Sequence, residues 1–317
     1  MSTSVDTHEH PPAFRHDAFL YEDGDEFLTG AMAFAGAALA AGEPLIVALE
    51  PSKIVLLKSQ LGSHAEAVQF VDVRVIGANP ARLIPAWRRF IDERAVAGAR
   101  VWGIGEPVWP ERSEAEVTEC HRHEALVGVA FADVPELSLL CPYDTSALDP
   151  AVIEGARRTH PTVLEHGTRR ASPTYSGLAG SGSLEDPLPE PRALALTLAF
   201  GTSELAEIRR QVEGRALAAG LTLDRREDIV LAVNEIATNS IRHAGGQGVL
   251  RIWREPDVLI CEVADRGLID DPLAGRERPG GAQVGGYGLW LANQVCDLVQ
   301  VRSGTGGSTV RVHMRTG

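Results

Sequence analysis

A glutamate and an asparagine four residues apart could act together in this sequence. Glu235 and Asn239 lie in the run AVNEIATNSIRHA, and residues four apart share one face of a helix. The amide oxygen of Asn239 can bind Mg²⁺, which prefers oxygen ligands. The carboxylate of Glu235 can accept a proton from an attacking hydroxyl or position a water. Solvated helices also carry such pairs, so the meaning of this one depends on the segments that follow it.

Two further segments contain residue types suited to binding a nucleotide. Asp265 ends a predicted strand and precedes Arg266 and Gly267. Its carboxylate can accept a hydrogen bond from an exocyclic amine, although an Asp-Gly-type turn is an alternative. Gly286 and Gly288 enter a predicted helix in the run GGYGL. Glycines let the backbone approach phosphates, and a helix N-terminus offers free N–H groups and a favourable dipole.

The order and spacing of these three segments resemble the N, G1 and G2 boxes of the GHKL ATPase superfamily, over about residues 192–317. The resemblance implies ATP and Mg²⁺ as cofactors, with Asn239 on the magnesium ion and Asp265 on the adenine amine. Glu235 matches the position of the family's general base. The implied cofactor-binding residues are Asn239, Asp265, Gly267, Gly286, Gly288 and Leu289.

Within this superfamily, the run from Ala232 to Ala244 is most similar to the anti-sigma-factor serine kinases. Those proteins phosphorylate a Ser or Thr of an anti-anti-sigma partner of the STAS type and otherwise sequester a sigma factor. The resemblance therefore implies a Ser/Thr protein kinase with Glu235 as its catalytic base. It also implies a sigma factor and an anti-anti-sigma protein as partners, and a homodimer.

Two alternatives to the serine kinase remain. A non-catalytic regulator could use ATP only to set its affinity for a partner, but such a protein needs no base at Glu235. A histidine kinase would carry its phosphoacceptor on a helix before the ATP-binding domain. His160 and His166 lie in that part of the sequence, but Pro161 and Gly167 interrupt any helix around them. The serine kinase is therefore favoured.

The loop after the second segment departs from the family pattern. Ile269 stands where the family usually has a glycine. The loop also lacks lysine, which leaves Arg276 and Arg278 as its cationic candidates for a phosphate contact. We interpret both arginines as solvated loop charges.

The second domain must position these segments. Its predicted elements are a strand over 192–200, helices over 201–220 and 222–246, strands over 248–255 and 257–265, a loop over 268–286, a helix running into a strand over 289–301, and a strand over 308–315. The inner face of the long helix is marked by Ile229, Val233, Ile236 and Ser240. The order predicts a GHKL α/β sandwich, with one mixed sheet and helices on a single face.

The first half of the chain alternates strand-like and helical segments from Phe19 to about His160, which predicts an α/β sheet. Residues 1–17 are polar and are interpreted as a tail rather than a signal peptide. Residues 166–191 are rich in Gly, Ser and Pro, as is typical of a linker. We therefore expect a first domain over 1–165, a linker over 166–191 and a second domain over 192–317.

Several short runs of the first domain resemble the MEDS sensory family. The resemblance implies a RecA/KaiC-like α/β sensory domain that takes a small, hydrocarbon-like ligand. The pattern GxxxxGK[ST] does not occur in the sequence, so the domain is expected to lack a P-loop. The runs are GEP at 42–44, NP at 79–80 with the helix to Trp87, GEPVWP at 105–110, CHRHE at 120–124 and CPYD at 141–144.

Two hypotheses concern sites in the first domain. In open α/β sheets, the ends of strands border the ligand crevice. The residues predicted at or beside such ends are Glu106, Trp109, His123 and Tyr143. Ordinary packing in the core is an equal alternative for these four residues. The run CHRHE suggests a metal site. On a helix, however, Cys120 and His123 point one way while His121 and Glu124 point elsewhere. We favour a helix surface with one buried cysteine.

The composition narrows the class of protein further. The formal net charge of −13 argues against direct binding of nucleic acid, which needs a basic face. Four cysteines without CxxC spacing fit a reduced, cytoplasmic protein. The best apolar stretch, Phe27 to Ala41, is too short for a membrane span. The sequence therefore predicts a cytoplasmic protein with no membrane or nucleic-acid contact.

Overall fold

The computed structural model describes residues 14–96, 98–134, 136–182, 184–280 and 286–316. The chain divides into two compact units, and each unit contains one β-sheet. The predicted α/β class is confirmed for the chain as a whole. The first unit comprises residues 1–74, 87–111 and 127–180, and the second comprises residues 75–86, 112–126 and 181–317.

The sheet of the first unit is parallel except at one edge. Its strand order is β3-β2-β4-β5-β1-β6-β7, and only the pair of β6 with β7 is antiparallel among the described residues. Continuous apolar runs such as LIVAL form its inner strands, as is typical of sheets covered on both faces. The strands are β1 (Arg15–Tyr21), β2 (Leu45–Leu49), β3 (Val68–Asp72), β4 (Val101–Gly105), β5 (Leu137–Asp144), β6 (Thr162–Glu165) and β7 (Thr168–Ala171).

Local signals in the sequence mark the ends of several helices between these strands. Asp23 accepts hydrogen bonds from two backbone N–H groups at the start of α1, and Gly42 ends α1 with a φ of 68°. Ser113 and Glu116 form a capping box before α5. The helices are α1 (Gly24–Ala41), α2 (Pro51–Leu61), α3 (Val73–Ile76), α4 (Leu83–Arg94), α5 (Glu114–Ala130) and α6 (Pro150–Thr159).

Strand β1 corrects the expectation that residues 1–17 form a tail. Arg15 to Asp17 open this strand, which lies between β5 and β6 in the sheet. The polar residues hide the strand from a search for apolar runs, but Asp17 is buried and pairs with Arg169 at 2.8 Å. Arg169 lies on β7, so the expected linker 166–191 contributes its first residues to this sheet.

The sheet of the second unit corrects the expectation of mixed strands. Its order is β11-β12-β10-β9-β8, and every pairing between its described strands is antiparallel. Two consecutive helices between β8 and β9 return the chain in the opposite direction. Tight turns join β9 to β10 and β11 to β12, whereas the long loop and a further helix lie between β10 and β11. The strands are β8 (Leu196–Phe200), β9 (Gly248–Glu255), β10 (Val258–Asp265), β11 (Leu298–Gly304) and β12 (Gly307–Arg315).

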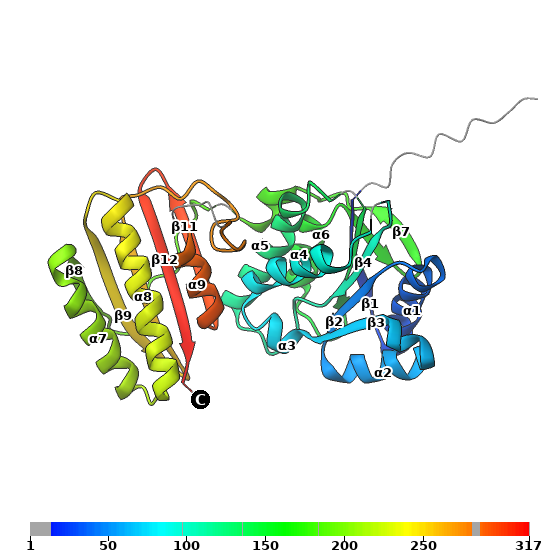
Figure 1. The fold of residues 1–317 in the computed structure, drawn as a ribbon, viewed down its shortest axis with the longest axis horizontal. Coiled ribbons are helices and arrows are strands. Elements are labelled where there is room, and N and C mark those ends of the chain that lie inside the picture. Colours follow the sequence, from blue (N-terminus) through cyan, green and yellow to red (C-terminus); the bar gives the residue numbers. More distant parts are fainter. Residues whose placement is uncertain (1–13, 97, 135, 183, 281–285, 317) are drawn as a thin grey trace, which may run out of the picture. The chain divides into compact units, whose positions relative to one another are not determined.

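Three helices cover one face of this second sheet, as predicted (Figure 1). They are α7 (Leu205–Ala218), α8 (Leu223–His243) and α9 (Tyr287–Val295). The predicted inner stripe of α8 is buried, and its apolar members pack with strand residues such as Leu250 and Val263. This burial fixes the rotation of α8 about its axis. None of the helices in the described ranges is long and apolar enough to cross a membrane.

Candidate nucleotide site

Helix α8 presents Glu235 and Asn239 at the start of α9. Both side chains are half-buried, beside the fully packed stripe of the same helix. The first turn of α9 passes directly over them. A Cβ added at Gly288 would lie 2.6 Å from Asn239 Nδ2 and 3.4 Å from Glu235 Cβ. The first and third sequence segments therefore meet, and a side chain larger than that of glycine at position 288 would have to displace the amide of Asn239.

The second segment joins the same site through Ser240. The hydroxyl of Ser240 donates to Asp265 Oδ2 at 2.5 Å, and the backbone N–H of Gly267 donates to Oδ1 at 2.8 Å. Both carboxylate oxygens are thus held from separate directions. Ser240 follows Asn239 directly, so one helix carries both the amide and the residue that orients Asp265.

Ser240 was predicted to lie on the inner face of the long helix, but it was not predicted to belong to the site. It was expected only as the last member of the inner stripe of α8. The signal that could have found it is its polarity, since the other three members of that stripe are aliphatic. A buried hydroxyl needs a hydrogen-bond partner, and Asp265 is the partner that the fold supplies.

Close backbone packing holds the chain after Asp265. A Cβ at Gly267 would lie 2.8 Å from the Cβ of Ala244, and one at Gly307 would lie 2.1 Å from the carbonyl oxygen of Asp265. The hydroxyl of Ser308 also donates to the carbonyl of Gly267 at 2.9 Å. These contacts fix the backbone of the second segment against the end of α8 and the start of β12.

The departure at Ile269 has a structural counterpart. Its backbone N–H donates to the hydroxyl of Ser303 at 2.7 Å, and its side chain packs against the core of the second unit. An apolar residue that is anchored in this way takes the place of the family's second glycine. The loop therefore begins from a fixed point rather than from a flexible hinge.

Gly286 caps the N-terminus of α9 in the left-handed region, with a φ of 85°, where glycine is favoured. Leu289 is half-buried and packs against the core. Its Cβ would lie 2.8 Å from a Cβ added at Gly275, so its side chain faces the loop. Gly285, the first glycine of the sequence run, lies outside the described residues.

The two loop arginines differ. Arg278 is exposed, as expected. Arg276 is 6 % exposed, so the expectation of a solvated charge is wrong for it. Burial is the main cause that lowers the pKa of Arg276. Arg276 therefore belongs to the packed part of the loop.

The candidate ligand residues of the first domain are all buried. Glu106, at the end of β4, forms an ion pair with Lys53. Burial raises the pKa of Glu106 to about 7, and the Lys53 ammonium offsets part of that rise. The guanidinium carbon Cζ of Arg74 lies 5.6 Å from the centroid of the Trp109 ring, in a cation–π contact. The contact with Arg74 favours a packing role for Trp109. Ligand binding by Glu106 stays a prediction.

Substitution of Gly288 tests the contact between α8 and α9. Gly288→Ala should weaken Mg²⁺-dependent ATP binding by about 10-fold, since the new methyl group must displace Asn239 or the helix end at a cost of about 1–2 kcal/mol. Titration calorimetry measures the affinity. Gly214→Ala is the matched control, because its Cβ would meet nothing within 4 Å. Equal affinities in the two variants would contradict the proposed phosphate side of the site.

Comparisons with known proteins agree with the two-part organisation. The family of the histidine kinase-like ATPase domain matches residues 200–314. The MEDS family, described as the methanogen/methylotroph, DcmR sensory domain, matches residues 15–161. The serine-protein kinase RsbW of Halalkalibacterium halodurans is 31% identical over an alignment of 129 residues, which covers 37% of this chain and 80% of that protein.

A solved structure gives a weaker likeness. It is the crystal structure of the RsbU and RsbW domains of a Mycobacterium tuberculosis protein, which is 18% identical with a TM-score of 0.30. The match covers 39% of this chain and 32% of that one, so this chain spans about a third of that protein's structure. The sequence relationship rests instead on the two family matches and on the RsbW kinase. This chain therefore joins an N-terminal MEDS domain to a C-terminal histidine kinase-like ATPase domain, and through the latter it belongs to the family of the serine-protein kinase RsbW.

Proposed function

We propose that this protein is an ATP-dependent Ser/Thr protein kinase that regulates a sigma factor and is controlled by its MEDS domain. The observation that carries the proposal is the convergence on α8. Gly288 lies against Glu235 and Asn239, and Ser240 of the same helix holds Asp265. A candidate base, a candidate metal ligand and a candidate adenine acceptor are therefore parts of one site.

Each residue has a distinct role in binding ATP. Asp265, held by Ser240 and Gly267, accepts a hydrogen bond from the exocyclic amine of adenine. The amide oxygen of Asn239 binds Mg²⁺, which supplies charge neutralisation at the phosphates. The N-terminus of α9 offers backbone N–H groups at Gly286 and Gly288 to the phosphates. Leu289 of the same turn completes the cofactor-binding set.

Glu235 acts on the substrate protein. Its carboxylate accepts the proton of a Ser or Thr hydroxyl while the hydroxyl oxygen forms a bond to the γ-phosphorus. The bond from that phosphorus to the bridging oxygen breaks, and ADP leaves. Since phosphoryl transfer depends mainly on positioning and on charge stabilisation, a base on the same helix as the magnesium ligand keeps both at a fixed separation.

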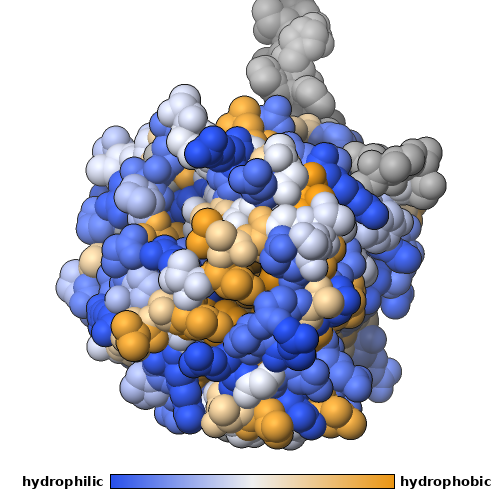
Figure 2. Space-filling model, turned by 90° about the vertical axis from the view of Figure 1, so that its left-hand side faces the viewer, coloured by the Kyte–Doolittle hydropathy of each residue, from blue (hydrophilic) through white to orange (hydrophobic). Residues whose placement is uncertain are grey.

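The partners follow from the family relationship. The substrate is an anti-anti-sigma protein of the STAS type, and the same domain sequesters a sigma factor. Two copies form a dimer through the ATPase domain. β8 is an edge strand of its sheet, and exposed large apolar residues of this unit include Leu194, Leu217 and Val249. Figure 2 shows apolar side chains gathered among polar ones on one face of the molecule.

The first domain is proposed to sense a small ligand and to control the kinase. Its boundaries are proposed as 1–165, with a linker over 166–191 and the kinase domain over 192–317. The match of the MEDS family to residues 15–161 supports this assignment. The protein is proposed to act in the cytoplasm, without direct contact to nucleic acid.

One transfer assay tests the proposed function. The full chain is incubated with γ-labelled ATP, Mg²⁺ and a STAS-type partner, and the expected product is an acid-stable phosphoester on a Ser or Thr of the partner. Acid-labile label on the chain itself would instead indicate a histidine kinase. That outcome is disfavoured because His160 follows the last residue of α6 and His166 lies between β6 and β7, so neither is on a helix. ATP-dependent partner binding without transfer would indicate a non-catalytic regulator.

A further inference from the structure

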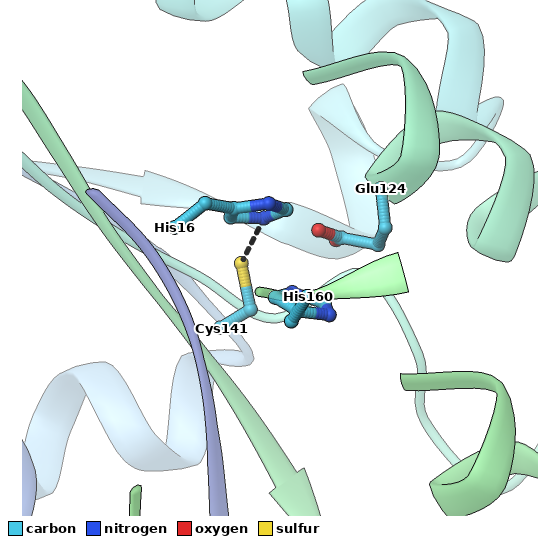
Figure 3. Close-up of side chains that lie close together, drawn as sticks. All are labelled: His16, Glu124, Cys141 and His160. Atoms are coloured by element: carbon cyan, nitrogen blue, oxygen red, sulfur yellow. Dashed lines mark hydrogen bonds between the residues drawn. The ribbon is translucent and has the colours of Figure 1, made fainter. Parts of the chain in front are cut away.

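Four buried side chains of the MEDS domain point toward one another (Figure 3). His16 lies on β1, Cys141 on β5 and Glu124 on α5, and His160 directly follows α6. One ligand atom of each lies within 4.8 Å of those of all the others. All four belong to the segment that matches the MEDS family. None of them belongs to the nucleotide site described above.

Strand pairing explains why two of these residues meet. β1 runs parallel to β5, with Ala18 opposite Cys141. His16 is two residues before Ala18, and side chains two apart on a strand share a face. His16 Nε2 therefore lies 3.4 Å from Cys141 Sγ. In a tetrahedral zinc site with ordinary Zn–N and Zn–S lengths, these atoms are about 3.5 Å apart.

The remaining two residues complete the shell from the helical layer. The ring centroids of His16 and His160 are 4.0 Å apart. The Glu124 carboxylate also points into the cluster (Figure 3). A separation of 4.8 Å, the upper bound within the cluster, must close by about 1.5 Å to reach the ligand–ligand distances of a tetrahedral zinc site. Rotations of these four side chains supply a movement of that size.

The environment of His160 matches that of a metal-binding imidazole. Its Nδ1 lies 2.9 Å from the carbonyl oxygen of Ala156. A carbonyl only accepts hydrogen bonds, so Nδ1 carries the proton and Nε2 carries the lone pair. Metal-binding histidines usually donate their second ring N–H to a carbonyl or carboxylate in this way, and the contact fixes the ring orientation.

Charge balance points to a divalent ion. A thiolate at Cys141 and a carboxylate at Glu124 would place two negative charges in a buried location, which is costly unless they are paired or bind a metal. Two neutral imidazoles add no charge, so a divalent ion makes the set neutral. Nitrogen and sulfur donors favour zinc over magnesium or calcium, and four protein ligands leave no position for substrate.

We propose that His16, Glu124, Cys141 and His160 form a tetrahedral site for a zinc-type divalent ion inside the MEDS domain. The ion ties β1 and β5 to the helices α5 and α6, and so it stabilises the fold of this domain. The site is independent of the kinase assignment, because none of its residues takes part in binding ATP.

Cobalt serves as the spectroscopic probe. The full chain is purified, treated with a chelator and titrated with Co²⁺. We expect one equivalent to bind, with the intense visible bands of tetrahedral cobalt and a thiolate-to-cobalt charge-transfer band. Competing Zn²⁺ should displace the cobalt and raise the thermal unfolding temperature. Absence of binding in the wild-type chain, or six-coordinate cobalt without a thiolate band, would overturn the proposal whether or not any variant folds.

Two cysteine variants locate the ion. Cys141→Ser should lose the charge-transfer band and weaken cobalt binding by about 100-fold or more, beyond the 10–100-fold typical of residues outside the ligand shell. Cys120→Ser is the matched control, since Cys120 is also buried in this domain but lies outside the cluster. A band that survives in Cys141→Ser, or that disappears in Cys120→Ser, would place the metal elsewhere. Circular dichroism and ATP binding verify that both variants are folded.

Discussion

Glu235→Gln should reduce phosphoryl transfer to the partner protein by about 10²–10⁴-fold, the usual contribution of a positioned base. The amide keeps the shape of the side chain but cannot accept the proton of the substrate hydroxyl. ATP affinity should remain nearly unchanged, because Glu235 acts on the substrate and not on the nucleotide. Some transfer should persist, since the magnesium ion and the bound phosphates keep their positions. Single-turnover transfer rates and calorimetry of ATP binding measure the two effects separately.

Glu227→Gln is the matched control for this experiment. Glu227 lies on the same helix but is exposed, so its substitution should leave transfer at the wild-type rate. Sequestration of the sigma factor should survive both changes, because that contact needs the surface and not the proton transfer. Equal transfer rates for the wild type and Glu235→Gln would show that Glu235 is not the base.

Asp265→Ala should weaken ATP binding by about 10- to 150-fold, which corresponds to about 1.5–3 kcal/mol for a hydrogen bond to a charged group. The variant loses the proposed acceptor of the adenine amine and also leaves the hydroxyl of Ser240 without its carboxylate partner. Guanine carries a carbonyl where adenine carries that amine, so the wild type should reject GTP. In the variant, the ratio of ATP to GTP affinity should approach one.

Nucleotide selectivity separates recognition from a merely structural role. Asp270→Ala is the control, because Asp270 is exposed in the loop that follows and should change neither affinity nor selectivity. An Asp265→Ala protein that binds both nucleotides weakly but still prefers ATP would show that another group reads the base. Ser240→Ala should give a smaller loss of affinity in the same direction, since it releases only one of the two contacts that hold the carboxylate.

The sequence determined most of the second domain. The period of apolar residues on α8 predicts which face of this helix is buried, and the structure confirms it. Glu235 and Asn239 therefore lie beside the buried face, where they are half-buried. Gly42, Gly62 and the capping box at Ser113 mark helix ends because their conformations and hydrogen bonds are local. Local signals of this kind need no knowledge of distant segments.

Only the tertiary structure decided strand direction and strand order. The order of elements predicted a mixed second sheet, but the two consecutive helices α7 and α8 turn the chain so that β9 runs antiparallel to β8. In the first sheet, the opening residues of β1, Arg15 to Asp17, fall within the expected tail because His16 and Asp17 interrupt the apolar pattern of this strand. Its burial becomes favourable only when β5, β6 and Arg169 surround it.

The same distinction separates the two candidate sites. The residues of the nucleotide site occur in three local motifs, and their types alone suggested the chemistry; the structure added Ser240, whose role depends on the end of β10. The cluster of His16, Glu124, Cys141 and His160 has no local motif, since its members come from four separate elements. The run CHRHE on α5 suggested a metal site made of residues adjacent to Glu124 in the sequence, whereas Glu124 clusters with His16, Cys141 and His160. Residues adjacent on a helix point in different directions, whereas parallel pairing of β1 with β5 brings together side chains more than a hundred positions apart.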